Sequence, residues 1–448
     1  MTLKRISIAS LIALTGISYS VHADTLLQIY QVAKIKDPTI LKSKAQSDAY
    51  SEKISESKAS LLPQIGFSAD TSYIGKNNDY SYSTYGATLA LSQSLYNSAY
   101  WQQLGLSEKE ATEYEIIYNI SAQNLLLRTA TAYFNVLRAD ETVKSVQANK
   151  RAVERQLEQT KQRFEVGLIA ITDVHEAQAE YDRTTADEII AENALANTYY
   201  TLRELTGTDV LKLSYLNTAT FSPSKLEGDV ATWRKKSLEH NLTLHSKRIA
   251  KELAKMQIEL AQAGHKPTLA LTTSLDHHSS TYEDDTYNTT ASASELNYDN
   301  LNTGTIGLEL NVPLYTGGKI TSLVKQAQYN YVIASEDLVE TYRSTEAQVN
   351  SGYNNVNASI SSIRAYEQAV LSSRSAVDAT EAGFEVGTRT IVDVLDAMRA
   401  LYAAENQLAN ARYDYIINML QLKFYAGTLS EQDITDISNG LTEMRPAS

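Results

Sequence analysis

Apolar residues recur at helical spacing along two very long stretches of the chain. In the first, residues 100–165, neither glycine nor proline occurs between Gly105 and Gly167. About sixty residues at a rise of about 1.5 Å each give a rod of roughly 90–100 Å, far longer than a helix of a compact domain. The second stretch, residues 319–385, predicts another such rod. Apolar positions of the first stretch advance by sevens, threes and fours, as along a coiled-coil seam: Val136, Val143, Val146, Val153, Leu157 and Phe164.

Each long stretch ends in the same short motif. Residues 164–176 read FEVGLIAITDVHE and residues 384–396 read FEVGTRTIVDVLD, which places Asp393 220 positions after Asp173. The glycine in each copy lies where one helix is expected to end and an antiparallel partner to begin. The motif therefore predicts the tips of two helical hairpins. The alternative is that these are ordinary helix–helix turns whose only role is to reverse the chain. The predicted return helices cover residues 172–206 and 390–425.

Four shorter segments alternate apolar and polar residues with the period of a β-strand. In the last of them Ile306, Leu308 and Leu310 share one face, whereas Thr305 and Glu309 share the other. Each segment is about ten residues long, and polar residues separate the two members of each pair, so the pattern predicts two β-hairpins. The predicted strands cover residues 64–75, 85–96, 268–277 and 304–315.

These elements occur in the same order twice, so the chain contains an internal repeat. Asp37 is suited to cap a helix, and Asn241 stands at the corresponding place 204 positions later. The predicted repeats cover residues 24–230 and 231–426, each with a helix, a strand pair, a long helix and a return helix. Residues 427–448 form a polar tail that we expect to be either equatorial, beside the middle of the rods, or disordered.

The first residues predict a signal peptide over residues 1–23. A basic pair at residues 4–5 precedes an apolar run at residues 6–17, and Val21 and Ala23 place small residues at the −3 and −1 positions of a cleavage site. The mature protein is therefore expected to be exported. No later run reaches about twenty apolar residues, so no membrane-spanning helix is expected.

Composition narrows the classes of function. The formal net charge is −13 and no basic face is visible, so we expect no nucleic-acid partner. The chain contains no cysteine, which excludes disulfides, thiol catalysis and cysteine–zinc sites. Residues 316–319 resemble part of a phosphate-binding loop, but Pro313 occupies the position of the first glycine that such a loop requires.

Other candidate reactive groups are weak. His175 has no second histidine at ligand spacing. His277 and His278, together with the acids at residues 283–285, could bind a metal, but a long polar loop over residues 277–302 explains them better. No nucleophile–base set stands out. We therefore expect neither an enzyme nor a metal or cofactor site.

The strands and rods together favour a membrane barrel. Strands of about ten residues suit a tilted crossing of an outer-membrane hydrocarbon layer. Four strands cannot close alone, and open edges are not tolerated in lipid, so copies of the chain must pool their strands. Two copies give eight strands with a filled interior, and three give twelve with a lumen. A soluble β-sandwich shows the same alternation, but the signal peptide and the long rods favour the barrel.

Six short motifs lie along the chain: SLLPQ at 60–64, TATAYFNVL at 129–137, RFEVG at 163–167, NVPLYTGG at 311–318, GTRTIVDVLD at 387–396 and NARY at 410–413. With these motifs the sequence resembles the TolC family of outer-membrane channel proteins over essentially the whole mature chain. The resemblance implies an α+β fold: a homotrimer whose twelve-stranded membrane β-barrel, four strands per chain, joins a long periplasmic α-helical barrel of coiled helices. It implies an exit channel in the outer membrane of a Gram-negative bacterium that serves tripartite multidrug efflux pumps and type I protein secretion. The implied partners are a periplasmic adaptor protein, an inner-membrane transporter of the RND, ABC or MFS type, and outer-membrane lipid.

Asp393 and Asp396 are three residues apart, so they share one helix face close to the tip. Threefold symmetry would turn them into two stacked rings of carboxylates that attract cations, and crowding of like charge would raise some of their pKa values. A solvated helix face would show the same spacing. The resemblance places the rings at a constricted periplasmic entrance.

Arg389 lies four residues before Asp393 and could pair with it within the helix. The resemblance gives it another task, which is to hold neighbouring helices closed through Thr172 and Asp173. The family carries a linking tyrosine where this chain has Phe384, so a hydroxyl bond to Asp173 cannot form there. The closed state would then depend more on Arg389 or on apolar packing of Phe384.

For six further residues near the tips, the resemblance alone implies a role. Two match the positions of polar links between helices: Gln156 and Glu381. Four form the hairpin-tip turns that the resemblance assigns to adaptor contact: Gly167, Leu168, Gly387 and Thr388. A coiled-coil stalk would need no strand hairpins, and an envelope enzyme would need a catalytic set. The sequence therefore favours a passive export channel.

Overall fold

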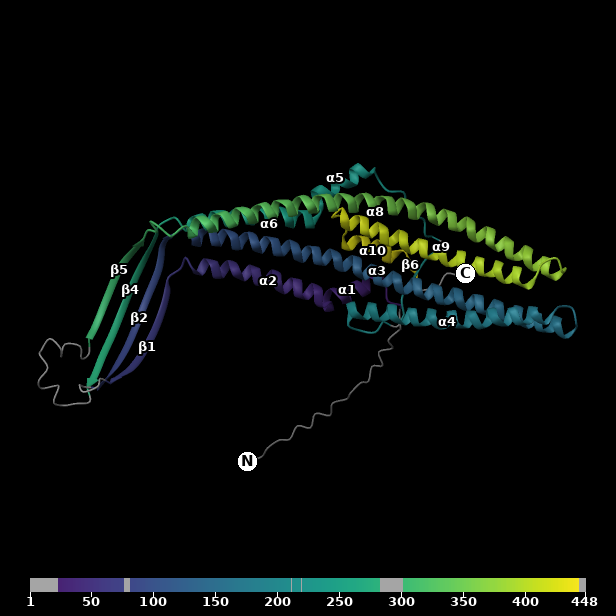
Figure 1. Ribbon diagram of the computed structural model, residues 1–448, viewed down its shortest axis with the longest axis horizontal. Coiled ribbons are helices and arrows are strands. Elements are labelled where there is room, and N and C mark those ends of the chain that lie inside the picture. Colours follow the sequence, from purple (N-terminus) through teal and green to yellow (C-terminus); the bar gives the residue numbers. More distant parts are fainter. Residues whose placement is uncertain (1–22, 76–80, 211, 219, 283–300, 443–448) are drawn as a thin grey trace, which may run out of the picture.

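The protein is an elongated molecule with a four-stranded sheet at one end and two helical hairpins that reach the other (Figure 1). Its two longest helices, α3 (Ser98–Glu165) and α8 (Lys319–Glu385), contain 68 and 67 residues. They turn back at their tips into α4 (Ile171–Thr206) and α9 (Ile391–Tyr425). Among the described residues, no helix is both long enough and apolar enough to cross a membrane. The computed structural model describes residues 23–75, 81–210, 212–218, 220–282 and 301–442.

Some predicted features lie outside these ranges. They are residues 1–22 of the expected signal peptide, the turn at residues 76–79, the acidic cluster Glu283, Asp284 and Asp285, and residues 443–448 of the tail.

Each hairpin reverses through a glycine in the left-handed region. Gly167 and Gly387 both have a φ of 77°. This backbone conformation is unfavourable for any residue that has a Cβ atom. The reversal closes with a backbone hydrogen bond from Leu168 N to Arg163 O of 2.9 Å in the first tip. The glycine turns therefore fall where the repeated motif predicts them.

Four strands form one antiparallel sheet. The pairing sets apolar side chains beside one another on one face, with Phe67 opposite Leu89 and Leu89 opposite Leu275. The other face is polar, and the Thr88 hydroxyl donates to Asp276 Oδ1 at 2.8 Å. One face can therefore meet an apolar medium while the other meets water. The sheet order is β1 (Gln64–Gly75), β2 (Ser81–Asn97), β4 (Thr268–Tyr282), β5 (Leu301–Asn311).

Three of the four strands differ from their predicted bounds. β2 begins at Ser81, four residues earlier than expected, and β4 continues five residues past 277, because residues 82–87 and 277–282 keep pairing with each other. β5 starts at Leu301 and ends at Asn311, four residues before the predicted end. Pro313 lies two residues beyond this end, and a proline has no N–H group to donate to a ladder.

Short helices precede each strand pair. Asp37 caps the second of them by accepting the N–H of Ile40 at 3.0 Å, and Asn241 accepts the N–H of Leu244 at 2.9 Å in the second repeat. The buried Asp37 carboxylate also pairs with Arg128 of α3, with 3.1 Å between Oδ2 and Nη2. Both predicted caps are therefore present. The helices are α1 (Leu26–Lys36), α2 (Pro38–Ala59), α5 (Val230–His240) and α6 (Leu242–Ala263).

The largest apolar core lies midway along the rods. Tyr133 and Phe134 of α3 are fully buried there, beside Ile363 of α8 and Leu420 of α9. The Tyr133 hydroxyl donates to the carbonyl oxygen of Ser214 at 2.6 Å, so the polar end of this ring is satisfied inside the core.

Residues 427–442 of the expected tail are ordered, so the disordered alternative is wrong for them. Its helix α10 (Glu431–Asn439) buries Ile434 completely in the main core. Lys423 of α9 forms an ion pair with Asp433 at the start of this helix. The strand β6 (Leu441–Thr442) then pairs with β3 (Tyr215–Leu216) of the connection between the repeats. The tail is ordered because a few of its apolar side chains pack into the main core. The polar composition of the tail does not predict this packing.

Both return helices end at a glycine with positive φ, at equivalent places 220 positions apart. Gly207 has a φ of 65° and Gly427 a φ of 71°. The surroundings differ, because the junction between α5 and α6 passes directly over Gly427. A Cβ at Gly427 would lie 2.6 Å from Asn241 N and closer still to the His240 carbonyl group, whereas the nearest atom to one at Gly207 is Lys36 Cδ at 3.7 Å.

Candidate functional site at the hairpin tips

The turn residues of both tips are exposed at the end of the molecule (Figure 1). The four residues predicted to contact an adaptor all lie there: Gly167, Leu168, Gly387 and Thr388. Apolar side chains accompany them, since Leu168 and Val386 are each about three-quarters exposed, at 73% and 75%. Each tip therefore presents a small apolar surface to solvent.

Asp393 lies in the first turn of α9, where it forms a capping box. The N–H and hydroxyl of Thr390 donate to Asp393 Oδ2 at 2.8 and 2.9 Å, and the Asp393 N–H donates back to Thr390 Oγ1 at 3.2 Å. The Thr390 backbone and hydroxyl donors, and more weakly Arg389, lower the pKa of Asp393. Within one chain the pKa shift is opposite to the rise expected from crowded carboxylates, which requires neighbouring copies.

Arg389 is held beside Asp393 but is not fully engaged by it. Its Nη1 lies 4.0 Å from Asp393 Oδ1, and its side chain is largely exposed. The stem of Arg389 packs on Gly383, where a Cβ would lie only 2.7 Å from Arg389 Cγ. A glycine at position 383 therefore allows the arginine to lie against α8 with its guanidinium free to reach a neighbouring element.

The first repeat lacks the cap that holds Asp393. Position 170, equivalent to Thr390, is Ala170, and α4 begins with no side-chain cap. Asp173 lies in the first turn of α4 but makes no side-chain hydrogen bond or ion pair with the part of the chain that the structure describes. Thr172 is exposed beside it. These two residues are therefore available to a group from outside the chain.

Phe384 is buried between the two hairpins. Its side chain is 8% exposed, and the Arg163 guanidinium lies 4.6 Å from the centroid of its ring. Arg163 Nη1 also donates to the Phe384 carbonyl oxygen at 3.4 Å. The equivalent ring of Phe164 is half-exposed, so the two repeats use this aromatic differently. Phe384 belongs to a buried apolar cluster with Ala152, Val153, Val377, Ile391, Val394, Leu395 and Met398.

Gln156 and Glu381 are not brought together within the chain. Gln156 is buried on α3, whereas Glu381 is exposed on α8. No hydrogen bond joins the two among the described residues. A polar link that involves them would require a neighbouring copy or a rearrangement of the tips.

Asp396 belongs to a charged network that the sequence pattern does not predict. Arg399 donates from Nη1 to Asp396 Oδ1 at 2.8 Å and from Nη2 to Glu180 Oε2 of α4 at 2.9 Å. Arg183 donates to the other oxygen of Glu180 at 2.9 Å. Helical spacing could have revealed the pairing of Arg399 with Asp396, but the contact with Glu180 depends on how α9 packs beside α4.

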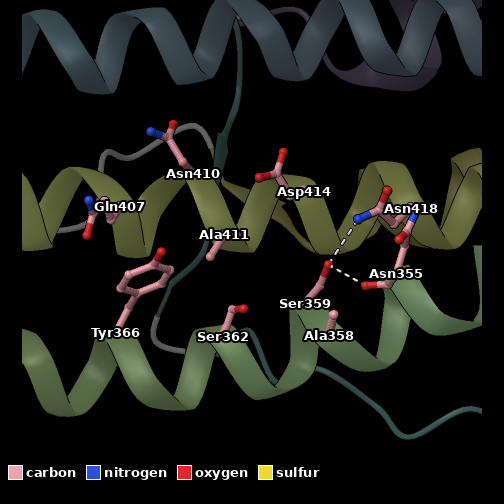
Figure 2. A pocket seen from close by; sticks show the side chains of 10 residues that line it. All are labelled: Asn355, Ala358, Ser359, Ser362, Tyr366, Gln407, Asn410, Ala411, Asp414 and Asn418. Atoms are coloured by element: carbon pink, nitrogen blue, oxygen red, sulfur yellow. Dashed lines mark hydrogen bonds between the residues drawn. The ribbon is translucent and has the colours of Figure 1, made fainter.

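A polar pocket of about 310 Å³ lies away from the tips, between α8 and α9 (Figure 2). Side chains of both helices face each other across it, and Asn418 Nδ2 donates to Ser359 Oγ at 3.0 Å. Its one acid, Asp414, forms an ion pair with Arg138 of α3. The lining of amides and hydroxyls includes no nucleophile beside a base.

The two histidines of β4 lie on neighbouring positions of the sheet. His277 Nδ1 is 2.8 Å from Asn302 Oδ1 of β5, with the tautomer setting which atom donates. Among the residues that the structure describes, no group of three histidine, aspartate or glutamate side chains could hold a metal ion.

Comparison with known proteins covers nearly the whole chain. A family model described as outer membrane efflux protein matches residues 29–208 and 233–428. The outer membrane protein TolC of Vibrio cholerae is 47% identical over 96% of this chain and 96% of its own. The alkaline protease secretion protein AprF of Pseudomonas aeruginosa is 29% identical over 91% of this chain and 85% of its own. The Campylobacter jejuni CmeC outer membrane channel shares the fold, with a TM-score of 0.77, 15% identity and 98% of each chain covered.

Proposed function

Because the chain belongs to the outer membrane efflux protein family, we infer that it is an exit channel in the outer membrane of a Gram-negative bacterium. It serves both efflux and type I protein secretion, since it is similar over most of its length to TolC and to a protease secretion protein. It is a passive conduit rather than an enzyme, and the energy comes from its partners.

The observation that carries this function is the two-faced sheet with free edges. β1 and β5 each have one edge without a partner among the described strands. Phe67 and Leu308 are strongly exposed on the apolar face, whereas Thr88 and Asp276 lie on the polar face. Three copies of the sheet give a closed barrel of twelve strands, with the apolar face toward lipid and the polar face toward water.

The partners are pump components. Exposed apolar residues at the tips, Leu168 and Val386, support docking of a periplasmic adaptor protein at the turns. We assign the adaptor contact to Gly167, Leu168, Gly387 and Thr388. An inner-membrane transporter of the RND, ABC or MFS type would supply the driving force through that adaptor.

The tips act as the gate of the channel. Asp393 and Asp396 form two carboxylate rings in the trimer, and Arg389 closes the entrance by reaching Thr172 and Asp173 of a neighbouring hairpin. Two features support this assignment: Arg389 is only loosely paired with Asp393, and the Asp173 carboxylate makes no hydrogen bond or ion pair with any described residue. Gln156, Glu381 and Phe384 contribute further closing contacts.

Reconstitution tests the proposed channel. The purified protein should run as a heat-dissociable trimer in mild detergent and should conduct ions in planar lipid bilayers. The expectation follows from the free edges of β1 and β5, which lipid does not tolerate. A stable monomer that forms no pores would rule the function out.

Arg389→Ser should raise the conductance of the isolated channel. Closing contacts of about 1 kcal/mol in each of three copies would together shift the open–closed equilibrium by roughly 3 kcal/mol, which is more than a hundredfold. Arg374→Ser is a matched control, because Arg374 is equally exposed but pairs with Glu405 inside its own hairpin. Equal conductance of the two variants would show that Arg389 is only an intra-helix partner of Asp393.

A further inference from the structure

One arginine joins two carboxylates that belong to different hairpins. The guanidinium of Arg399, on α9, donates to Asp396 on its own helix and to Glu180 on α4. Both N–O distances, 2.8 and 2.9 Å, are those of charge-assisted hydrogen bonds. Among the described residues, this is the one ion pair between α4 and α9.

The pair lies close to the proposed gate. Arg399 is eight residues into α9, and Glu180 is nine residues into α4, so both lie about 12–14 Å along the helix from the tip turns. α4 packs mainly on α3, and α9 mainly on α8, so few other contacts hold these two return helices together. Any movement that separates them near the tip must break the bond between Arg399 and Glu180.

Glu180 depends on its cationic partners. Its side chain is only 9% exposed, and each carboxylate oxygen accepts from one arginine, Arg183 or Arg399. A carboxylate withdrawn from water in this way is unfavourable unless its charge remains compensated. Loss of Arg399 would leave Arg183, a neighbour on the same helix, as its one charged partner among the described residues.

We propose that Arg399 has two positioning roles at the entrance. It ties α9 to α4 within each protomer, which favours the closed state, and it offsets the charge of the Asp396 ring, which weakens cation binding there. The inference rests on the proposed function, since both roles concern a conducting trimer. The two roles use different bonds of the same guanidinium, so they can be separated by mutation.

Arg399→Met keeps the length of the stem but removes both bonds. We expect a channel conductance well above the wild-type value, because three ties are lost per trimer. We also expect block by La³⁺ added from the periplasmic side to tighten at least tenfold, because Asp396 loses its cationic neighbour. Glu180→Met breaks the tie alone, because methionine is of similar length but has no oxygen to accept from Arg399, so conductance should rise with no tightening of La³⁺ block.

Arg183→Met is the matched control, because it removes the other partner of Glu180 and leaves both bonds of Arg399 in place. Its conductance and La³⁺ block should remain at wild-type values. The double variant Glu180→Met with Arg399→Met should conduct no more than Arg399→Met alone, since both changes remove the same tie.

Failure of this inference is distinct from failure of the channel function. If the wild-type protein forms no pores, the proposed function is wrong. If the wild-type protein conducts and Glu180→Met conducts equally, the tie is wrong, even when Arg399→Met does not assemble. If Arg399→Met shows wild-type La³⁺ block, the effect on Asp396 is wrong.

Discussion

Gly427→Ala is expected to prevent assembly of the channel. Gly427 has a φ of 71°, which a residue with a Cβ adopts only at a cost. A Cβ there would also lie 2.6 Å from Asn241 N and closer to the His240 carbonyl group. These are backbone atoms at the junction of α5 and α6, where Asn241 Nδ2 donates to Tyr425 O, so no flexible side chain can move aside. We expect a loss of at least about 4 kcal/mol in the free energy of unfolding.

The internal repeat supplies the control. Gly207→Ala changes the equivalent glycine, with a φ of 65°, but its Cβ would meet only Lys36 Cδ at 3.7 Å. This substitution should lower the free energy of unfolding by about 1–2 kcal/mol, because only the left-handed conformation is unfavourable there. Yield of heat-dissociable trimer and the urea midpoint in detergent measure the difference. Equal losses in the two variants would show that the close approach to Gly427 can relax.

Asp393→Asn combined with Asp396→Asn is expected to weaken block by multivalent cations very strongly. A trimer would lose six carboxylates, and each pair of unit charges at about 4 Å contributes about 1 kcal/mol even at the dielectric constant of water. Block by La³⁺ should therefore weaken by well over a hundredfold, and cation selectivity should fall. Asp48→Asn with Glu52→Gln removes the same charge from the exposed face of α2, far from the tips, and should leave block unchanged.

The pH dependence of this block should reflect the cap of Asp393. A depressed pKa keeps the carboxylate ionised below the usual titration range of an aspartate, and its charge is lost only as the pH falls through that lowered value. Block should therefore persist at pH 5. Thr390→Ala removes one of the two donors and should move the loss of block to higher pH. An unchanged profile would show that crowding in the trimer, rather than the cap, controls the charge.

The periodic parts of the fold could be predicted from the sequence. The two rods, the glycine turns and the strand pairs each follow from the spacing of residues along the chain. That spacing can be recognised without knowing which other elements pack against them. The contacts of Arg399 with Glu180 and of Arg163 with Phe384 could not be predicted in this way. They depend on the axial alignment of helices from different hairpins, and a shift of one turn would give different partners.

The tail shows a different limit. α10 carries only two isoleucines along nine residues, Ile434 and Ile437, and its remaining positions are mostly polar or charged. Such a short helix has little stability of its own, and it forms because Ile434 enters an existing core. At the tips, Phe384 could be located from the motif, but its burial against Arg163 could not. The cap difference between Ala170 and Thr390 is visible in the sequence once the start of each return helix is known.

The unequal starts of α4 and α9 determine how many equivalent binding sites a trimer can offer at its tips. One hairpin begins its return with a threonine–aspartate cap and the other with an alanine, although the turns themselves are alike. Six hairpins in a trimer would therefore alternate between two chemical kinds around the entrance. A ligand that recognises the glycine turns and their apolar neighbours would find six equivalent places, whereas one that recognises the threonine cap would find three. The stoichiometry of a bound partner would thus show whether it recognises the glycine turns or the threonine cap.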